Sequence, residues 1–184
     1  MQPNISRMTR AVAVCLLASQ LSFPQVQQRT YTSKGKTIRY SVTVFAPLAR
    51  ITPDNGALNQ DTALNCVRLY WSRLKNLDIK GAADVYLDPQ AEIETRTKYR
   101  ERVGEDVFRE MHSKVFESNR FIGELVIGTQ HALVSESNPG TLMLFSLRDR
   151  KFFIESFDAR KASQAAQDLV TLVNAYGDGK LKFE

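Results

Sequence analysis

The chain has 184 residues, of which 43% are hydrophobic and 24% are charged, with 25 Lys and Arg against 20 Asp and Glu. Such a length suits one domain, and the composition is that of a folded globular protein, so disorder is not the default expectation. Acidic residues interrupt the richest basic cluster, a pattern typical of a salt-bridged surface. We therefore expect no nucleic-acid partner. The cluster consists of Arg96, Lys98, Arg100 and Arg102, with Glu92, Glu94 and Glu101 among them.

Residues 1–22 have the features of an export signal. Arg7 and Arg10 precede a short apolar run, Ala11–Ala18, and small residues that suit cleavage follow it. The run is much shorter than the ~20 apolar residues that a membrane-spanning helix needs, and no other stretch approaches that length. We therefore expect a periplasmic or secreted protein without a transmembrane segment.

The two cysteines have different interpretations. Val14 is too bulky for the position before the cysteine of a lipid-attachment box, so we do not expect Cys15 to make a lipoprotein. Once the signal is removed, Cys66 has no partner for a disulfide within the chain. Cys66 falls inside a helical pattern, and no neighbouring base in the sequence would activate it as a nucleophile. We predict a buried apolar side chain.

Residues 23–60 are expected to form a polar lead-in, a β-hairpin and a loop. The hairpin strands are Arg29–Ser33 and Lys36–Phe45, and the second alternates between apolar and polar positions. Gly35 can take the positive φ that a tight turn requires. Prolines and a glycine mark residues 46–60 as a loop and as the only candidate boundary inside the chain.

Helical spacing of apolar residues dominates the next segment. It predicts helices over 62–76, from Asp78 to Leu87 and over Glu105–Phe116. We also expect a short helix within the charged stretch 90–104, which ends at Gly104. Asp61 and Asp78 are the predicted N-caps of the first two helices. Asp88-Pro89 should end the second helix, because a residue before proline avoids helical backbone angles. In the fourth helix, the residues predicted to point inward are Val107, Phe108, Met111 and Val115.

The pattern then changes to strands. The candidates are Phe121–Ile127, Gln130–Ser135, Thr141–Leu147 and Lys151–Phe157. Short links with turn-forming residues join them, which predicts an antiparallel meander. Lys161–Tyr176 predicts a closing amphipathic helix, and Leu181–Glu184 a brief last strand. The expected fold class is α+β, with helices packed on an antiparallel sheet, a hairpin before them and a C-terminal helix after them.

A local motif accompanies this order of helices and strands. It runs from Tyr70 to Asp78 (YWSRLKNLD) and from Ala82 to Pro89 (AADVYLDP), with an aromatic helix, an Asp that starts the next helix and an Asp-Pro end. The combination resembles the NTF2-like (SnoaL-like) superfamily over residues 61–157. The resemblance implies a cone in which a curved sheet surrounds a helix-lined pocket, so we expect residues 61–184 to form an NTF2-like domain. The hairpin and the last helix are additions to the family pattern.

The resemblance also implies where a ligand would bind. Members of this superfamily hold a ligand in the cone or use its surface to dimerise, so a homodimer is one expectation. The residues that would line the pocket are Tyr70, Trp71, Tyr86, Phe108 and Met111. The same spacing also describes an ordinary hydrophobic core, and both interpretations stay open.

Three side chains on strand candidates form the only acid–base group that the sequence offers: His131, Glu124 and Glu155. Some relatives in the superfamily are isomerases or dehydratases with a pocket-facing Asp or His, and His131 could serve as such a general base if its face is concave. Outward carboxylates on an antiparallel sheet are merely solvated, and alternation does not reveal which face is concave. His112, in the fourth helix, is expected at the surface or its boundary.

No nucleophile-elbow, dinucleotide or phosphate-loop motif occurs, and the His and Cys content does not make a zinc set, so no cofactor or metal is expected. Three functions stay open. The first is a non-catalytic exported module that binds a small apolar ligand or a protein partner. The second is an isomerase or hydro-lyase that uses His131 with a carboxylate. The third is an inhibitor or immunity-like interaction protein, with a filled interior and an exposed apolar patch.

Overall fold

The computed structural model describes residues 26–50, 58–136, 142–156, 161 and 163–183. The strands are β1 (Val26–Ser33), β2 (Lys36–Arg50), β3 (Arg120–Ile127), β4 (Gln130–Ser135), β5 (Leu142–Arg148) and β6 (Lys151–Ile154). The helices are α1 (Ala63–Lys75), α2 (Ile79–Ala83), α3 (Pro89–Val103), α4 (Glu105–Ser118) and α5 (Gln164–Gly177). Helices and an antiparallel sheet together confirm the expected α+β class. The predicted signal, residues 1–22, lies outside the described residues.

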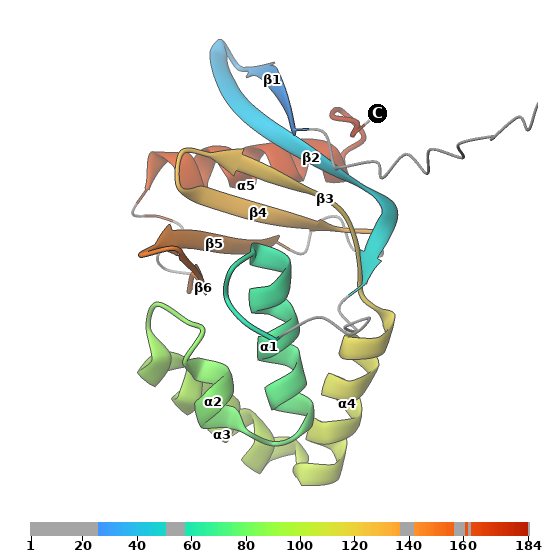
Figure 1. Cartoon of the computed structure of the whole chain (residues 1–184), viewed down its shortest axis with the longest axis vertical. Helices are drawn as coiled ribbons and strands as arrows, with labels where there is room; N and C mark the ends of the chain where they lie inside the picture. Colours follow the sequence, from blue (N-terminus) through green and yellow to red (C-terminus); the bar gives the residue numbers. More distant parts are fainter. Residues whose placement is uncertain (1–25, 51–57, 137–141, 157–160, 162, 184) are drawn as a thin grey trace, which may run out of the picture.

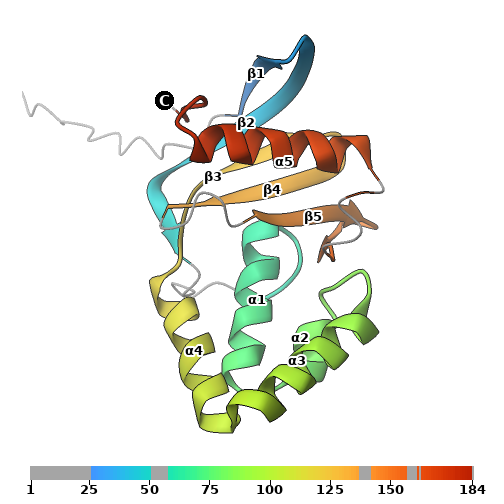
Figure 2. The same cartoon turned by 180° about the vertical axis from the view of Figure 1, so that it is seen from behind.

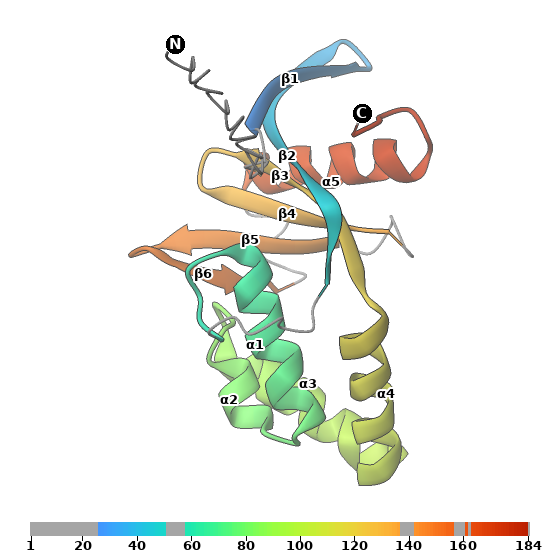
Figure 3. The same ribbon diagram turned by 45° about the vertical axis from the view of Figure 1, so that its right-hand side comes forward.

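The strands form a sheet whose order, β1 to β6, follows the chain, and each neighbour pairs antiparallel. Lys34 and Gly35, both with positive φ, make the two-residue turn between β1 and β2. β2 pairs with β3, with Thr43 opposite Glu124. Figure 3 shows β2 and β3 running side by side toward the helical layer. The N-terminal hairpin is therefore part of the same sheet as the meander, and α1–α4 are an insertion between its second and third strands.

The two faces of the sheet carry different helices. α5 lies along one face, and α1–α4 extend from the other (Figures 1 and 2). Alternation along β4 follows this division, because Ala132 and Val134 join the apolar cluster under α5 and Leu133 joins the cluster under α1. The protein thus has two hydrophobic cores, one on each face of the sheet.

The helix starts differ in detail from the sequence predictions. The N-cap of α1 is Thr62, whose hydroxyl accepts a hydrogen bond from the Asn65 backbone N–H at 3.0 Å. The predicted cap, Asp61, instead accepts a hydrogen bond from the Asn65 side chain at 2.8 Å. Asp78 caps α2 as predicted, and its carboxylate accepts the Gly81 N–H at 2.9 Å. The two short polar side chains at 61 and 62 compete for the same role, and the sequence alone favours neither.

The second helix is shorter than predicted. α2 ends at Ala83 instead of reaching Leu87, because Tyr86 leaves the helix to form an isolated parallel β-bridge with Ile154. The Ile154 N–H also donates to the Val85 carbonyl at 2.8 Å. This pairing with the end of β6 is a tertiary interaction that no local pattern indicates.

The inward face of α4 is rotated from the predicted one. Val107 and Met111 are 47% and 44% exposed, so their predicted inward position is wrong. Phe108 is buried as predicted, and His112 and Phe116 complete the buried stripe at a spacing of four residues. His112 is only 3% exposed, which contradicts the expected surface position. The prediction failed because it excluded a polar side chain from a helical stripe to which the spacing assigns it.

The segment after α5 forms no strand at 181–183. It instead turns back so that the buried Phe183 ring packs on β3 at Gly123. A Cβ at position 123 would collide with that ring and would lie 2.6 Å from the Thr43 carbonyl oxygen. The C-terminal segment can therefore approach the sheet only because residue 123 lacks a side chain.

We predict that Gly123→Ala destabilises the fold by about 1–3 kcal/mol, because the added methyl group overpacks this contact. Urea unfolding of the two proteins measures the difference in the free energy of unfolding. The matched test repeats the substitution in a Phe183→Ala background. In that background, Gly123→Ala should lower the free energy of unfolding by less, because only the close approach to the Thr43 backbone remains. An equal cost in both backgrounds would refute the role of Phe183.

Candidate functional site

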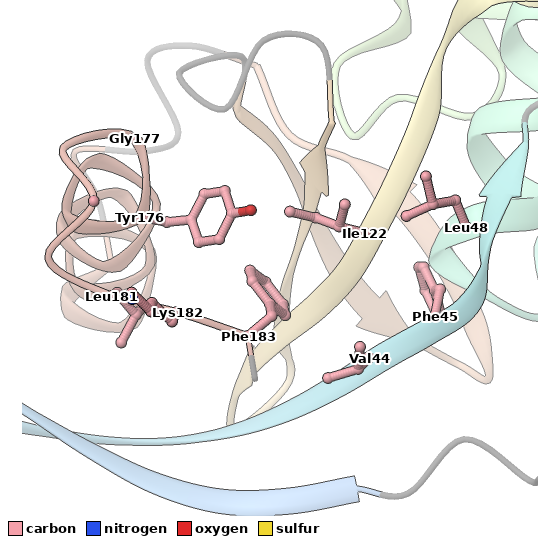
Figure 4. Close-up of a pocket in the computed structure, with 10 residues that line it drawn as sticks. Val44, Phe45, Leu48, Ile122, Tyr176, Gly177, Leu181, Lys182 and Phe183 are labelled. Atoms are coloured by element: carbon pink, nitrogen blue, oxygen red, sulfur yellow. The ribbon is translucent and has the colours of Figure 1, made fainter.

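An open apolar pocket of about 610 Å³ lies between β2, β3 and the C-terminal end of α5 (Figure 4). Its main apolar walls are Val44, Phe45, Leu48, Ile122, Tyr176 and Phe183. In Figure 4 the Tyr176 side chain projects from α5 toward Ile122 of β3. The Tyr176 and Phe183 rings lie edge to face, with centroids 4.9 Å apart. The pocket is thus built from three segments that are distant in the sequence.

A β-bulge in β2 helps to form this pocket. β1 begins at Val26, opposite Thr43, so β2 continues beyond the start of its neighbour. The register between β2 and β3 then shifts between Val44 and Ala49. A bulge of this kind re-aims the side chains around it. Val44 packs with the core under α5 and Phe45 with the core under α1, as the alternation of side chains along a strand requires.

Polar contacts hold the C-terminal wall of the pocket in place. The Arg29 guanidinium donates to the Lys182 carbonyl at 2.6 Å and to the Phe183 carbonyl at 2.8 Å. An ion pair between Lys36 and Asp168 joins the same hairpin to α5. Because these bonds fix the backbone next to the pocket, its wall is arranged before any ligand enters.

The five residues that the resemblance assigned to a pocket lie in or on the helical layer. Tyr70 packs against Trp71 and Tyr86, with ring centroids 5.0 and 5.2 Å away. Tyr70 and Phe108 are fully buried core residues, and Met111 is on the surface. None of the five is among the lining residues of the apolar pocket between β2, β3 and α5.

A buried polar cluster lies beside these aromatic rings. The Tyr70 hydroxyl donates to Glu92, and the Arg96 Nε–H donates to the same carboxylate oxygen at 2.6 Å. Burial, and then the neighbouring Tyr86, raise the pKa of Tyr70. Burial lowers the pKa of Arg96, but Tyr70 and Glu92 raise it by more, so Arg96 stays charged. The four-residue spacing of Glu92 and Arg96 was the available signal, but it did not indicate burial.

Of the three predicted acid–base residues, the structure brings His131 and Glu124 together and places Glu155 elsewhere. His131 Nδ1 and Glu124 Oε1 are 2.7 Å apart, and the two side chains are 14% and 19% exposed. The Phe152 ring contacts the His131 ring edge to face, with a centroid distance of 4.7 Å. Because His131 lies opposite Phe145 in the ladder, this pair is on the face under α1.

Glu155 is on the other face, with a different set of partners. The Ser146 hydroxyl donates to Glu155, and the Gln130 side-chain amide donates to the Ser146 oxygen at 2.6 Å. Ser146 follows Phe145 in β5 and so points toward α5. The expectation that Glu155 belongs with His131 is therefore not met. Within the described part of the chain, Glu155 Oε2 and Gln130 Oε1 are buried and have no hydrogen-bond partner.

Cys66 is fully buried, and its thiol donates to the Phe152 carbonyl at 3.2 Å. Burial raises the pKa of this thiol to about 12, so it is a protonated side chain in the core, in agreement with the sequence prediction. Among the described residues, no three His, Cys, Asp or Glu side chains are grouped in a way that could hold a metal ion. No helix in the same residues has the length and apolar character needed to span a bilayer.

Comparison with known proteins gives no relative: no family model, no curated protein sequence and no solved structure matches the chain.

The burial of His112 predicts how the free energy of unfolding depends on pH. Its Nδ1–H donates to the Phe108 carbonyl at 2.6 Å, and burial lowers its pKa. The unfolded chain binds a proton at this residue near pH ~6.5, whereas the folded chain does so only at lower pH. The free energy of unfolding must therefore fall as the pH drops through about 6.5, until the folded histidine also protonates.

Chemical denaturation between about pH 7.5 and 5.5 measures this loss. His112→Gln should show a smaller loss than the parent protein. Identical pH dependence in the parent and His112→Gln proteins would rule out the buried neutral histidine.

Proposed function

We propose that the chain is an exported binding module that takes a small apolar ligand in the pocket between β2, β3 and α5. The observation that carries this proposal is the pocket itself. Its volume falls within the ~300–1,000 Å³ typical of small-molecule sites, and aromatic and aliphatic side chains dominate its walls. Lys182 adds a single cation to the lining, which would suit a ligand with a polar end. Export is supported by the signal-like residues 1–22.

The proposed relationship to NTF2-like domains has separate support. Helices followed by the antiparallel meander β3–β6 are the order that the resemblance implies. The apolar pocket, however, involves α5 and the hairpin strand β2, which are additions to the family pattern. The ligand proposal therefore does not depend on that relationship.

Binding can be tested with N-phenyl-1-naphthylamine, an uncharged probe whose fluorescence rises in apolar surroundings. We expect saturable binding to the parent protein. Leu48→Gln should weaken it about five-fold, because a half-buried leucine contributes about 1 kcal/mol to an apolar contact. Leu58→Gln is the matched control, since Leu58 is 40% exposed and does not line the pocket. Absence of saturable binding, or equal weakening by both substitutions, would contradict the proposal.

The bond between His131 and Glu124 favours a second candidate function, acid–base catalysis of the isomerase or hydro-lyase type. When Nδ1–H donates to a carboxylate, Nε2 is left free to accept a proton from a substrate. The pair is only partly exposed, and Phe152 covers one side of the imidazole. A general base held by an orienting carboxylate is a common arrangement in enzymes.

This candidate predicts proton abstraction next to a carbonyl group. The measurement is the rate at which simple ketones take up deuterium from D₂O, followed by NMR with the parent, His131→Gln and Glu124→Gln proteins. Loss of a general base should slow exchange by about 10²-fold or more, and loss of the orienting carboxylate should slow it less. The His112→Gln protein is the control. If the parent protein gives no exchange above buffer, this function is abandoned.

A further inference from the structure

One face of α3 forms a second pocket, with a cationic lining. Its volume is about 490 Å³, and Thr95, Arg96, Lys98, Tyr99 and Arg102 line it. Residues 95, 98, 99 and 102 recur every three or four positions, so they share one side of the helix. None of the described residues that line it carries a carboxylate. The pocket is separate from the apolar pocket between β2, β3 and α5, because the two share no lining residue.

The sequence predicted that this cluster would be salt-bridged, and the described residues show this only for Arg96, which pairs with Glu92. Within the same residues, neither Lys98 nor Arg102 has a carboxylate within 4.0 Å. Glu94 instead accepts a hydrogen bond from Gln90 at 3.2 Å. The interruption of basic residues by acidic ones in the sequence therefore does not neutralise the charge on this face.

Contacts behind the pocket hold its two arginines. The Tyr99 hydroxyl donates to the Met111 sulfur at 2.9 Å, and its ring packs 5.9 Å from the Phe108 ring. The Arg102 guanidinium lies over the Tyr99 ring, 5.2 Å from its centroid, in a cation–π contact. Arg96 is fixed through its Nε by the buried Glu92. Arginines held in this way lose less conformational entropy when they bind an anion.

The balance of charge indicates what the pocket would bind. Among the described residues, Glu92 compensates Arg96, and no carboxylate compensates Lys98 or Arg102, which leaves two positive charges on this face. A phosphate monoester carries about −1.5 to −2 at neutral pH and accepts several charge-assisted hydrogen bonds. We propose that the α3 pocket is a binding site for a phosphate monoester, either on a small molecule or on a lipid headgroup.

A helix C-terminus attracts cations through its dipole, and this is the competing explanation for basic residues in the last turn of α3. Arg100 and Arg102 are both in that turn. Arg102 lines the pocket, and Arg100 does not. Arg100→Gln removes the same charge from the same turn and is therefore the matched control.

The test is a titration of the full protein with methyl phosphate, followed by the backbone amide NMR signals of residues 95–102 at constant ionic strength. We expect saturable shifts, at least about tenfold weaker binding in Lys98→Gln/Arg102→Gln, and less than about twofold weakening in Arg100→Gln. Lys98→Gln alone, at an exposed position, should weaken binding about threefold without affecting the fold.

A second arm distinguishes the two sources of the phosphate monoester. Vesicles of phosphatidylcholine with phosphatidic acid present the same group on a lipid, and sedimentation measures binding to them. Saturable binding to methyl phosphate or to these vesicles supports the proposal if it is lost in Lys98→Gln/Arg102→Gln and retained in Arg100→Gln. No binding in either arm, or equal loss in the double variant and in Arg100→Gln, would overturn it.

Discussion

Pairing between β2 and β3 is the interaction on which the rest of the molecule depends. The helices α1–α4 separate these two strands in the chain, yet Ser41–Val44 align with Gly123–Val126 in an antiparallel ladder. This ladder joins the hairpin to the meander and closes the helical insertion. It also gives the sheet two covered faces, so that two hydrophobic cores form on opposite sides of the same strands. The core under α1 supplies the burial energy that orders the helical insertion.

Local patterns were sufficient to predict most of the secondary structure, and long-range contacts account for the errors. Alternation and helical spacing indicated the hairpin, α1 and the meander, because those periods reflect burial on one face. The charged α3 has no such apolar period, since Glu92 is its buried residue. The early end of α2 depends on a bridge between Tyr86 and Ile154, which no pattern near Tyr86 reveals. His112 was misplaced because hydrophobicity was given more weight than its four-residue spacing from Phe108.

The candidate sites depend even more on long-range contacts, which local sequence patterns do not reveal. His131 and Glu124 could be named from the sequence, but their common face and the exclusion of Glu155 depend on strand register. The apolar pocket could not be foreseen, since it combines a bulge in β2, a residue without a side chain in β3 and the segment after α5. The basic residues of α3 were visible in the sequence, but acidic residues between them suggested that their charge was neutralised. Proximity in the sequence does not show which side of a helix a residue occupies.

The construction of the apolar pocket has a consequence for the order in which the protein matures. Val44 belongs to the second strand, whereas Tyr176 and Phe183 come from the end of the last helix and the segment after it. A chain synthesised from its N-terminus therefore carries one wall of the pocket long before the other wall exists. During synthesis, a nascent chain can hold no ligand there until nearly all the described residues have been made. Occupancy of the pocket would thus mark a chain that has been made at least as far as Phe183, and products cut short before that residue would lack it.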